Sequence, residues 1–114
     1  MNETNPSGVS QESEGALYER VEKAARAMGC DVMRNPAALT IKKDGIDVIF
    51  VNGKIASMTG EITRFSGPDG VYDQNKYNEA LRAMLAGLGG PFEYRIDMLG
   101  QVHKGTIGAD GGIS

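Results

Sequence analysis

Histidine and cysteine, the side chains most often used for acid–base and nucleophilic catalysis, occur once each, as His103 and Cys30. One of each provides neither a Cys-x-x-Cys pair nor a histidine pair for a metal ion. Cys30 directly follows a predicted helix end, where a cysteine is most often a small buried apolar residue. His103 lies beside a turn on the predicted last strand, so it is the candidate for acid–base chemistry. We expect a non-catalytic protein, with a small enzyme that uses His103 as a minor alternative.

Two further motifs have the composition of a ligand site but not its spacing. The glycine-rich run at residues 87–90 leaves a predicted helix, whereas phosphate-binding loops lead into a helix N-terminus. Asp69, Asp73 and Asn75 do not follow the spacing of a calcium-binding EF-hand loop, and no glutamate follows at the required distance. The sequence therefore predicts no metal site and no cofactor.

A pocket between the predicted helices and the sheet is the alternative basis for a function. Tyr18 and Tyr77 lie on the two predicted helices, while Tyr94 and His103 lie on the last two strands. Aromatic side chains whose polar tips converge are typical of small-ligand sites. If these four tips point inward together, the chain is a small-ligand-binding domain.

The elements that would position these residues are organised around residues 39–58. Two dipeptides in this stretch, Asp44-Gly45 and Asn52-Gly53, favour two-residue hairpin turns. Such a turn pairs the residues on either side of it, so we read the register outward from each turn. Around the second turn, this rule pairs Val48 with Ser57. The predicted core face of the three strands carries five large apolar residues, which are Leu39, Ile41, Val48, Phe50 and Ile55.

The opposite face of this predicted meander is apolar as well. Strand alternation places Ile49, Val51, Ala56 and Met58 on it. A contiguous apolar surface rimmed by polar residues is the pattern expected of a protein interface, and a two-fold dimer is its commonest form. We therefore predict an interface at these four residues, unless the final hairpin or Phe65 covers them.

Helical spacing of apolar residues predicts a first helix over residues 15–28, capped by Ser13, and a second helix from its cap, Asp73, to Gly87. Short strands are predicted at residues 30–34, 92–97 and 102–107, and residues 60–65 are expected to extend the meander. This order predicts an α+β fold with an antiparallel sheet of five to six strands, in which the three-stranded meander and a C-terminal hairpin combine. The two amphipathic helices are expected on one face of the sheet.

Composition sets the domain organisation and excludes several classes of partner. Residues 1–14 and 108–114 are poor in apolar residues and are expected to be disordered, with a single domain over residues 15–107. The net charge of −3 leaves no basic footprint for nucleic acid. No apolar run approaches the ~20 residues that span a bilayer, so we expect no membrane partner and a cytoplasmic location.

The leading functional hypothesis is a protein-interaction or regulatory module of the accessory or inhibitor type. Its partner would be another protein or a second copy of the chain, bound through the apolar sheet face or through a strand edge.

Overall fold

A computed structural model describes residues 13–113; most of the predicted N-terminal arm, residues 1–12, lies outside the described part. The elements, in chain order, are α1 (Glu14–Ala27), β1 (Asp31–Arg34), β2 (Ala38–Lys43), β3 (Ile46–Val51), β4 (Lys54–Gly60), the 3-10 helix η1 (Ile62–Phe65), α2 (Gln74–Gly87), β5 (Phe92–Met98) and β6 (Gln101–Ile107). Within residues 13–113, neither helix is long and apolar enough to cross a membrane.

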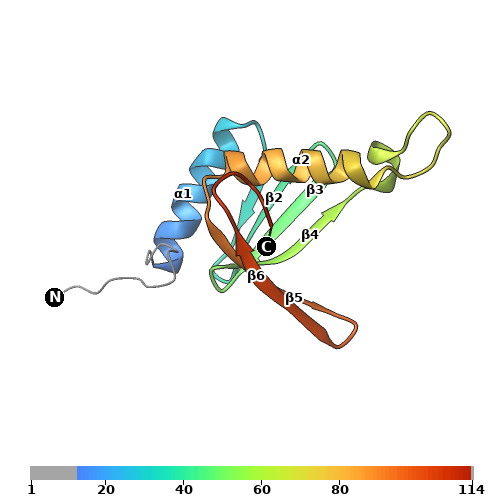
Figure 1. Cartoon of the computed structure of the whole chain (residues 1–114). Helices are drawn as coiled ribbons and strands as arrows, with labels where there is room; N and C mark the ends of the chain where they lie inside the picture. The colour runs from blue at the N-terminus through green and yellow to red at the C-terminus, as the bar shows by residue number, and fades with distance from the viewer. Residues whose placement is uncertain (1–12, 114) are drawn as a thin grey trace.

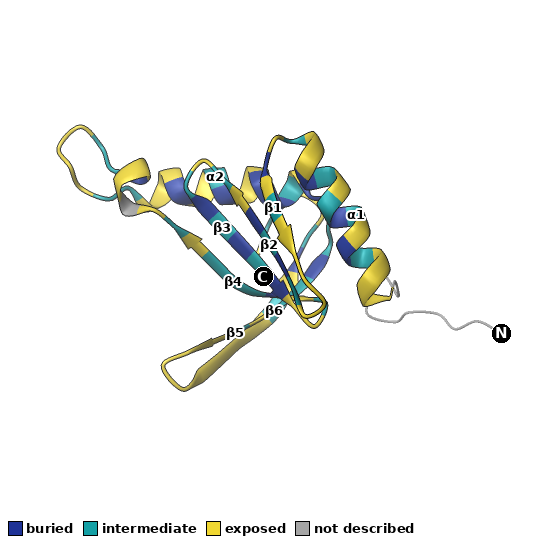
Figure 2. Cartoon of the chain, turned by 180° about the vertical axis from the view of Figure 1, so that it is seen from behind, coloured by how far each residue is buried: buried dark blue, intermediate teal, exposed yellow. Residues whose placement is uncertain are grey.

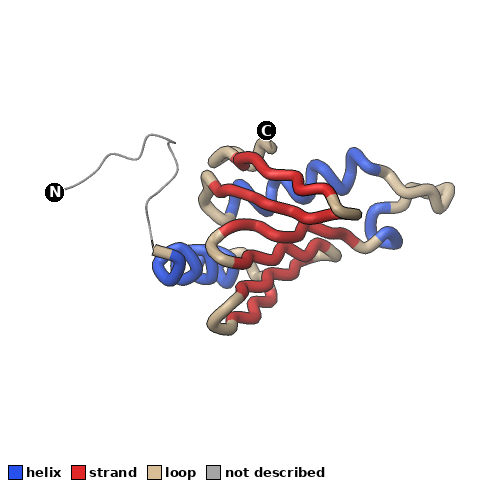
Figure 3. The backbone as a smooth tube through the Cα atoms, turned by 90° about the horizontal axis from the view of Figure 1, so that it is seen from below, coloured by secondary structure: helices blue, strands red, loops and turns tan. Residues whose placement is uncertain are grey.

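The strands of the described residues form one six-stranded sheet in the order β1-β2-β3-β4-β5-β6 (Figure 1). Both helices lie on one side of it, and from below the strands stand in front of α2 (Figure 3). The predicted α+β fold with two helices on one face is confirmed. The prediction of an antiparallel sheet needs one correction, because β4 and β5 run parallel. The reason is that α2 follows β4 in the chain. It carries the chain back to the end of the sheet at which β4 begins, so that β5 runs in the same direction as β4.

The register of the meander follows its turns for most of its length. Lys43 pairs with Ile46 and Leu39 with Phe50, as predicted. The predicted pairing of Val48 with Ser57 is wrong, because a β-bulge shifts the register and Val48 pairs with Met58 instead. Phe50 pairs with Ile55 and Ile49 with Ser57, so Ala56 is the extra residue of the bulge.

The core lies between the helices and the sheet, and buried positions alternate with more exposed ones along β2 and β3 (Figure 2). Phe50 is fully buried and has edge-to-face ring contacts with Tyr18 of α1 and Phe92 of β5. The T-shaped arrangement is favourable because the positive edge of one ring meets the negative face of the other. Further fully buried residues complete this core, and they include Val21, Leu39, Ile41, Val48, Ile55, Leu85, Leu88 and Ile107.

The segment after β4 turns out of the sheet. We expected residues 60–65 to extend the strand, but residues 62–65 form η1. Phe65 packs edge-to-face on Tyr77 at the start of α2, which also contacts the ring of Tyr72. These three rings therefore hold the N-terminal end of α2, where the Asp73 side chain accepts hydrogen bonds from two backbone N–H groups.

Residues 108–113, which belong to the expected C-terminal tail, make defined contacts. A tight turn brings Ile113 beside Ile107. The carboxylate of Asp110 accepts a hydrogen bond from the Gly112 N–H and pairs with Arg82 of α2 at 3.2 Å. The Gly112 bond lowers the pKa of Asp110, with a further contribution from Arg82. This turn joins the end of β6 to α2.

The far end of the β5–β6 hairpin projects from the rest of the sheet (Figures 1 and 2). It ends in a two-residue turn, Leu99-Gly100, in which both residues have positive φ, at 51° and 82°. The two turns of the meander have the same geometry but place Asp44 and Asn52 in the first position. Asp and Asn tolerate this left-handed conformation, whereas for a leucine it is strained. The side chain of Leu99 is also fully exposed.

Replacing Leu99 by Asn is therefore expected to raise the free energy of unfolding by about 1 kcal/mol, because the turn becomes compatible with its first residue. Urea denaturation followed by circular dichroism would measure the change. The reciprocal variant Asn52→Leu is expected to lower the free energy of unfolding by a similar amount. A Leu99→Asn variant no more stable than the parent would contradict this account of the turn.

Candidate functional site

The face of the sheet opposite the helices, here called the open face, is uncovered by any helix of the described residues (Figure 3). Strand pairing aligns Met33, Thr40, Ile49 and Ser57 in one row across it. Val51 lies two residues along β3 from Ile49 and therefore on the same face. Met33 is 68 % exposed and Val51 is 37 % exposed, while Ile49 is half-buried. We call Met33, Ile49 and Val51 the apolar patch.

Ion pairs border the apolar patch on two sides. Lys42 lies 3.9 Å from Asp47, and Lys54 lies 3.9 Å from Glu93. These are long, partly exposed pairs, which contribute little to folding stability. Each side carries one cation and one anion, so the border has no strong net charge. Such a border can face a partner, including a second copy of itself, without strong repulsion.

The four residues of the predicted interface do not all lie on the open face. Ile49 and Val51 lie on the open face. Met58 does not, because the bulge turns it to the core side, where it packs against the buried cluster. Ala56 is half-buried at the bulge itself. The position predicted for Met58 was wrong because alternation was counted through an extra residue.

Met33 is a member of the apolar patch that sequence reasoning missed. The signal was available, since Met33 alternates with the inward residue Val32 on a predicted strand. Pairing β1 with β2 as a fourth strand of the meander would have placed it beside Thr40.

The predicted ligand pocket is not assembled as a single site. Tyr18 is buried in the core, and its hydroxyl accepts a hydrogen bond from the backbone N–H of Gly53 at 3.1 Å. Burial raises the pKa of the Tyr18 hydroxyl. Tyr77 packs in the separate ring group with Phe65, and burial raises its pKa too. Both tyrosines therefore serve in packing.

The other two residues of that prediction lie on the C-terminal hairpin. Tyr94 pairs with Ile55 across the parallel junction and is half-buried. His103 pairs with Ile96 on the projecting part of the hairpin and is exposed. Tyr18 and Tyr94 border two different hollows. These positions place the four side chains at separate points of the fold.

Cys30 is buried, and burial raises the pKa of its thiol. A raised pKa keeps the sulfur protonated, which is the unreactive form. No group of three or more His, Cys, Asp or Glu side chains that could hold a metal ion occurs in the described part of the chain.

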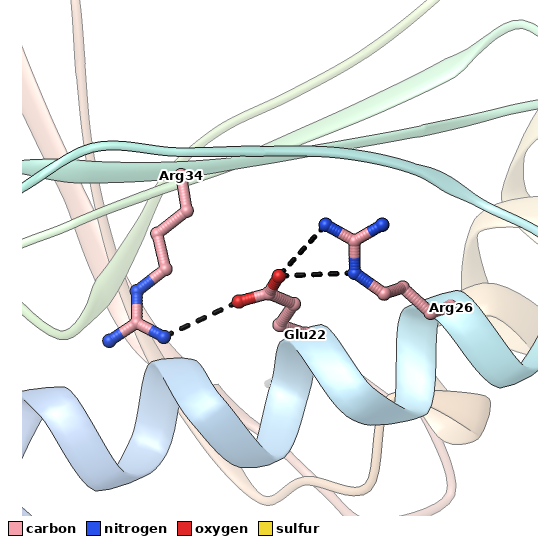
Figure 4. A network of polar contacts seen from close by, with 3 residues as sticks. All are labelled: Glu22, Arg26 and Arg34. Carbon is pink, nitrogen blue, oxygen red and sulfur yellow. Dashed lines mark hydrogen bonds and ion pairs between the residues drawn. The ribbon is translucent and has the colours of Figure 1, made fainter.

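A polar network joins α1 to the edge strand β1 (Figure 4). Glu22 accepts hydrogen bonds from Arg26 at 2.9 and 3.1 Å and from Arg34 at 3.3 Å. The bond from Arg26 is the main reason that the pKa of Glu22 is lowered. A hollow of about 530 Å³ lies beside this network. Because Glu22 already engages both guanidinium groups, the arrangement fixes α1 against β1.

No protein-family model, curated protein or solved structure matches the chain significantly. The function of the chain is therefore inferred from its own geometry.

Proposed function

We propose that this chain is a non-catalytic protein-interaction module of the accessory or regulatory kind, which contacts its partner through the open face. The observation that carries the proposal is the apolar patch of Met33, Ile49 and Val51. It lies on the sheet face that no helix of the described residues covers (Figure 3). Apolar side chains gathered on one exposed sheet face gain free energy when a partner removes them from water.

A second copy of the chain is the partner that we consider first. The border of the patch carries both signs of charge, so two patches can meet in a two-fold arrangement that brings cations near anions. The side chains at the centre of this surface are uncharged, which matches the depletion of charge at the centres of interfaces.

We expect the chain to self-associate and Val51→Glu to weaken the association about tenfold or more, because a carboxylate would be buried without a partner. Val71→Glu is the matched control: Val71 is an exposed valine, 62 % accessible, on the loop before α2 and away from the sheet. Sedimentation velocity across a concentration series would compare the parent with both variants.

Val71→Glu is expected to associate as the parent does, and both variants should keep the parent's circular dichroism. A parent chain that remains monomeric at every concentration would contradict self-association through the open face. Equal association of the parent and Val51→Glu would do the same.

A further inference from the structure

We infer that Asn52 is a modification site: its side-chain amide can deamidate, and the hydroxyl of Tyr18 holds this reaction back. The inference concerns the turn between β3 and β4 and goes beyond the apolar patch. It depends on three observations: the Asn52-Gly53 sequence, the exposure of the turn, and a hydrogen bond that holds the attacking atom.

The sequence of the turn is chemically suited to deamidation. Of the asparagines in the chain, Asn52 alone precedes a glycine. In the reaction, the backbone nitrogen of the following residue loses its proton and attacks the side-chain amide carbon. A succinimide ring forms and ammonia leaves, and water then opens the ring to give aspartate or iso-aspartate. A glycine favours the attack, because no side chain obstructs its nitrogen and its backbone rotates readily.

The turn exposes the reacting amide to water. Asn52 is exposed and Gly53 is half-buried, and both residues have positive φ, at 55° and 79°. Water, the one reactant that the chain does not itself supply, therefore has access to the side chain of Asn52. Burial does not protect this amide, so any protection must act on the attacking nitrogen.

A hydrogen bond from α1 holds the attacking nitrogen. The N–H of Gly53 donates to the hydroxyl oxygen of Tyr18 at 3.1 Å. Tyr18 is 2 % exposed and its ring packs edge-to-face on Phe50, so the hydroxyl has a fixed position. To attack Asn52, the Gly53 nitrogen would have to lose the bonded proton and turn away from Tyr18. Both changes break the bond, which therefore raises the barrier to ring formation.

The same bond makes the reaction depend on the docking of α1. Tyr18 belongs to α1, whereas Asn52 and Gly53 lie between two strands. Local opening of α1 from the sheet removes the hydroxyl and frees the Gly53 nitrogen. The product carries a new carboxylate, and iso-aspartate also adds a backbone carbon, in the turn that pairs Val51 with Lys54. Deamidation would therefore convert a transient opening of α1 into a permanent change of the turn.

The experiment compares the full chain with its Tyr18→Phe variant, incubated at mildly alkaline pH and followed by peptide mass spectrometry. Tyr18→Phe keeps the buried ring but removes the acceptor, so we expect Asn52 to deamidate about fivefold to tenfold faster. Val21→Ala is the matched control. It truncates a fully buried side chain of the same helix and lowers stability, but it keeps the Tyr18 hydroxyl and should accelerate the reaction less.

Hydrogen exchange measured by nuclear magnetic resonance gives a second readout, on the parent chain itself. The amide of Gly53 should exchange more slowly than the amide of an unstructured glycine. Tyr18→Phe should remove this protection while keeping the parent's circular dichroism. The inference is overturned if Gly53 is unprotected in the parent, if Tyr18→Phe deamidates at the parent's rate, or if Val21→Ala accelerates the reaction as much as Tyr18→Phe does.

Discussion

Replacing Phe50 by alanine is expected to lower the free energy of unfolding by about 3–5 kcal/mol, as for buried aromatic residues in general. Phe50 is fully buried and lies between the rings of Tyr18 and Phe92. Its removal would leave a cavity where α1, β3 and β5 meet, and it would end both ring contacts. Urea denaturation of the parent and variant would give the difference.

Val51→Ala provides the control for Phe50→Ala, because it truncates the next residue along the same strand on the opposite face. Val51 is partly exposed, so its truncation should change the free energy of unfolding by only about 0.5 kcal/mol. A loss below about 1 kcal/mol for Phe50→Ala would mean that Phe50 is not at the centre of the core.

Replacing Gly60 by alanine is expected to lower the free energy of unfolding by about 1–3 kcal/mol, because the site has no room for a side chain. A Cβ atom at Gly60 would lie 2.6 Å from two ring carbons of Tyr77 and 3.3 Å from Phe65. The ring of Tyr77 would have to move away from Phe65, which loosens the start of α2 from the sheet. Thermal and urea unfolding would measure the effect.

Two further variants separate the crowding at Gly60 from a general effect of alanine. In a Tyr77→Ala background, Gly60→Ala should cost less than in the parent, and this difference is the coupling between the two sites. Gly15→Ala, in the first turn of α1 with nothing within 4 Å of the new Cβ, should be neutral or stabilising. Equal costs of Gly60→Ala in the two backgrounds would show that Tyr77 is not the obstacle.

The meander was predictable from its turns, whereas the bulge in β4 was not. Asp44-Gly45 and Asn52-Gly53 have strong local preferences, and these preferences fix the pairing next to each turn. The residues around Ala56 are apolar or small on both faces, so their pattern is compatible with either register. Packing of Met58 into the core distinguishes the two registers, and packing depends on residues distant in the sequence.

Long-range partners also explain why the tyrosines could not be interpreted from the sequence. The hydroxyl of Tyr18 finds its partner in the N–H of Gly53, 35 residues away along the chain. Spacing along the helix places Tyr18 on the flank of the apolar stripe and does not show which donor it meets.

The order of the strands in the sheet has a consequence for the kinetics of folding. Each strand lies next to its neighbour along the chain, so the β1–β4 meander and the β5–β6 hairpin can each form through short loops. The pairing of β4 with β5 is different, because residues 61–91 must first be closed into a loop. Local contacts speed folding and distant ones slow it. We therefore expect the rate-limiting step to be the joining of two preformed halves as α2 docks.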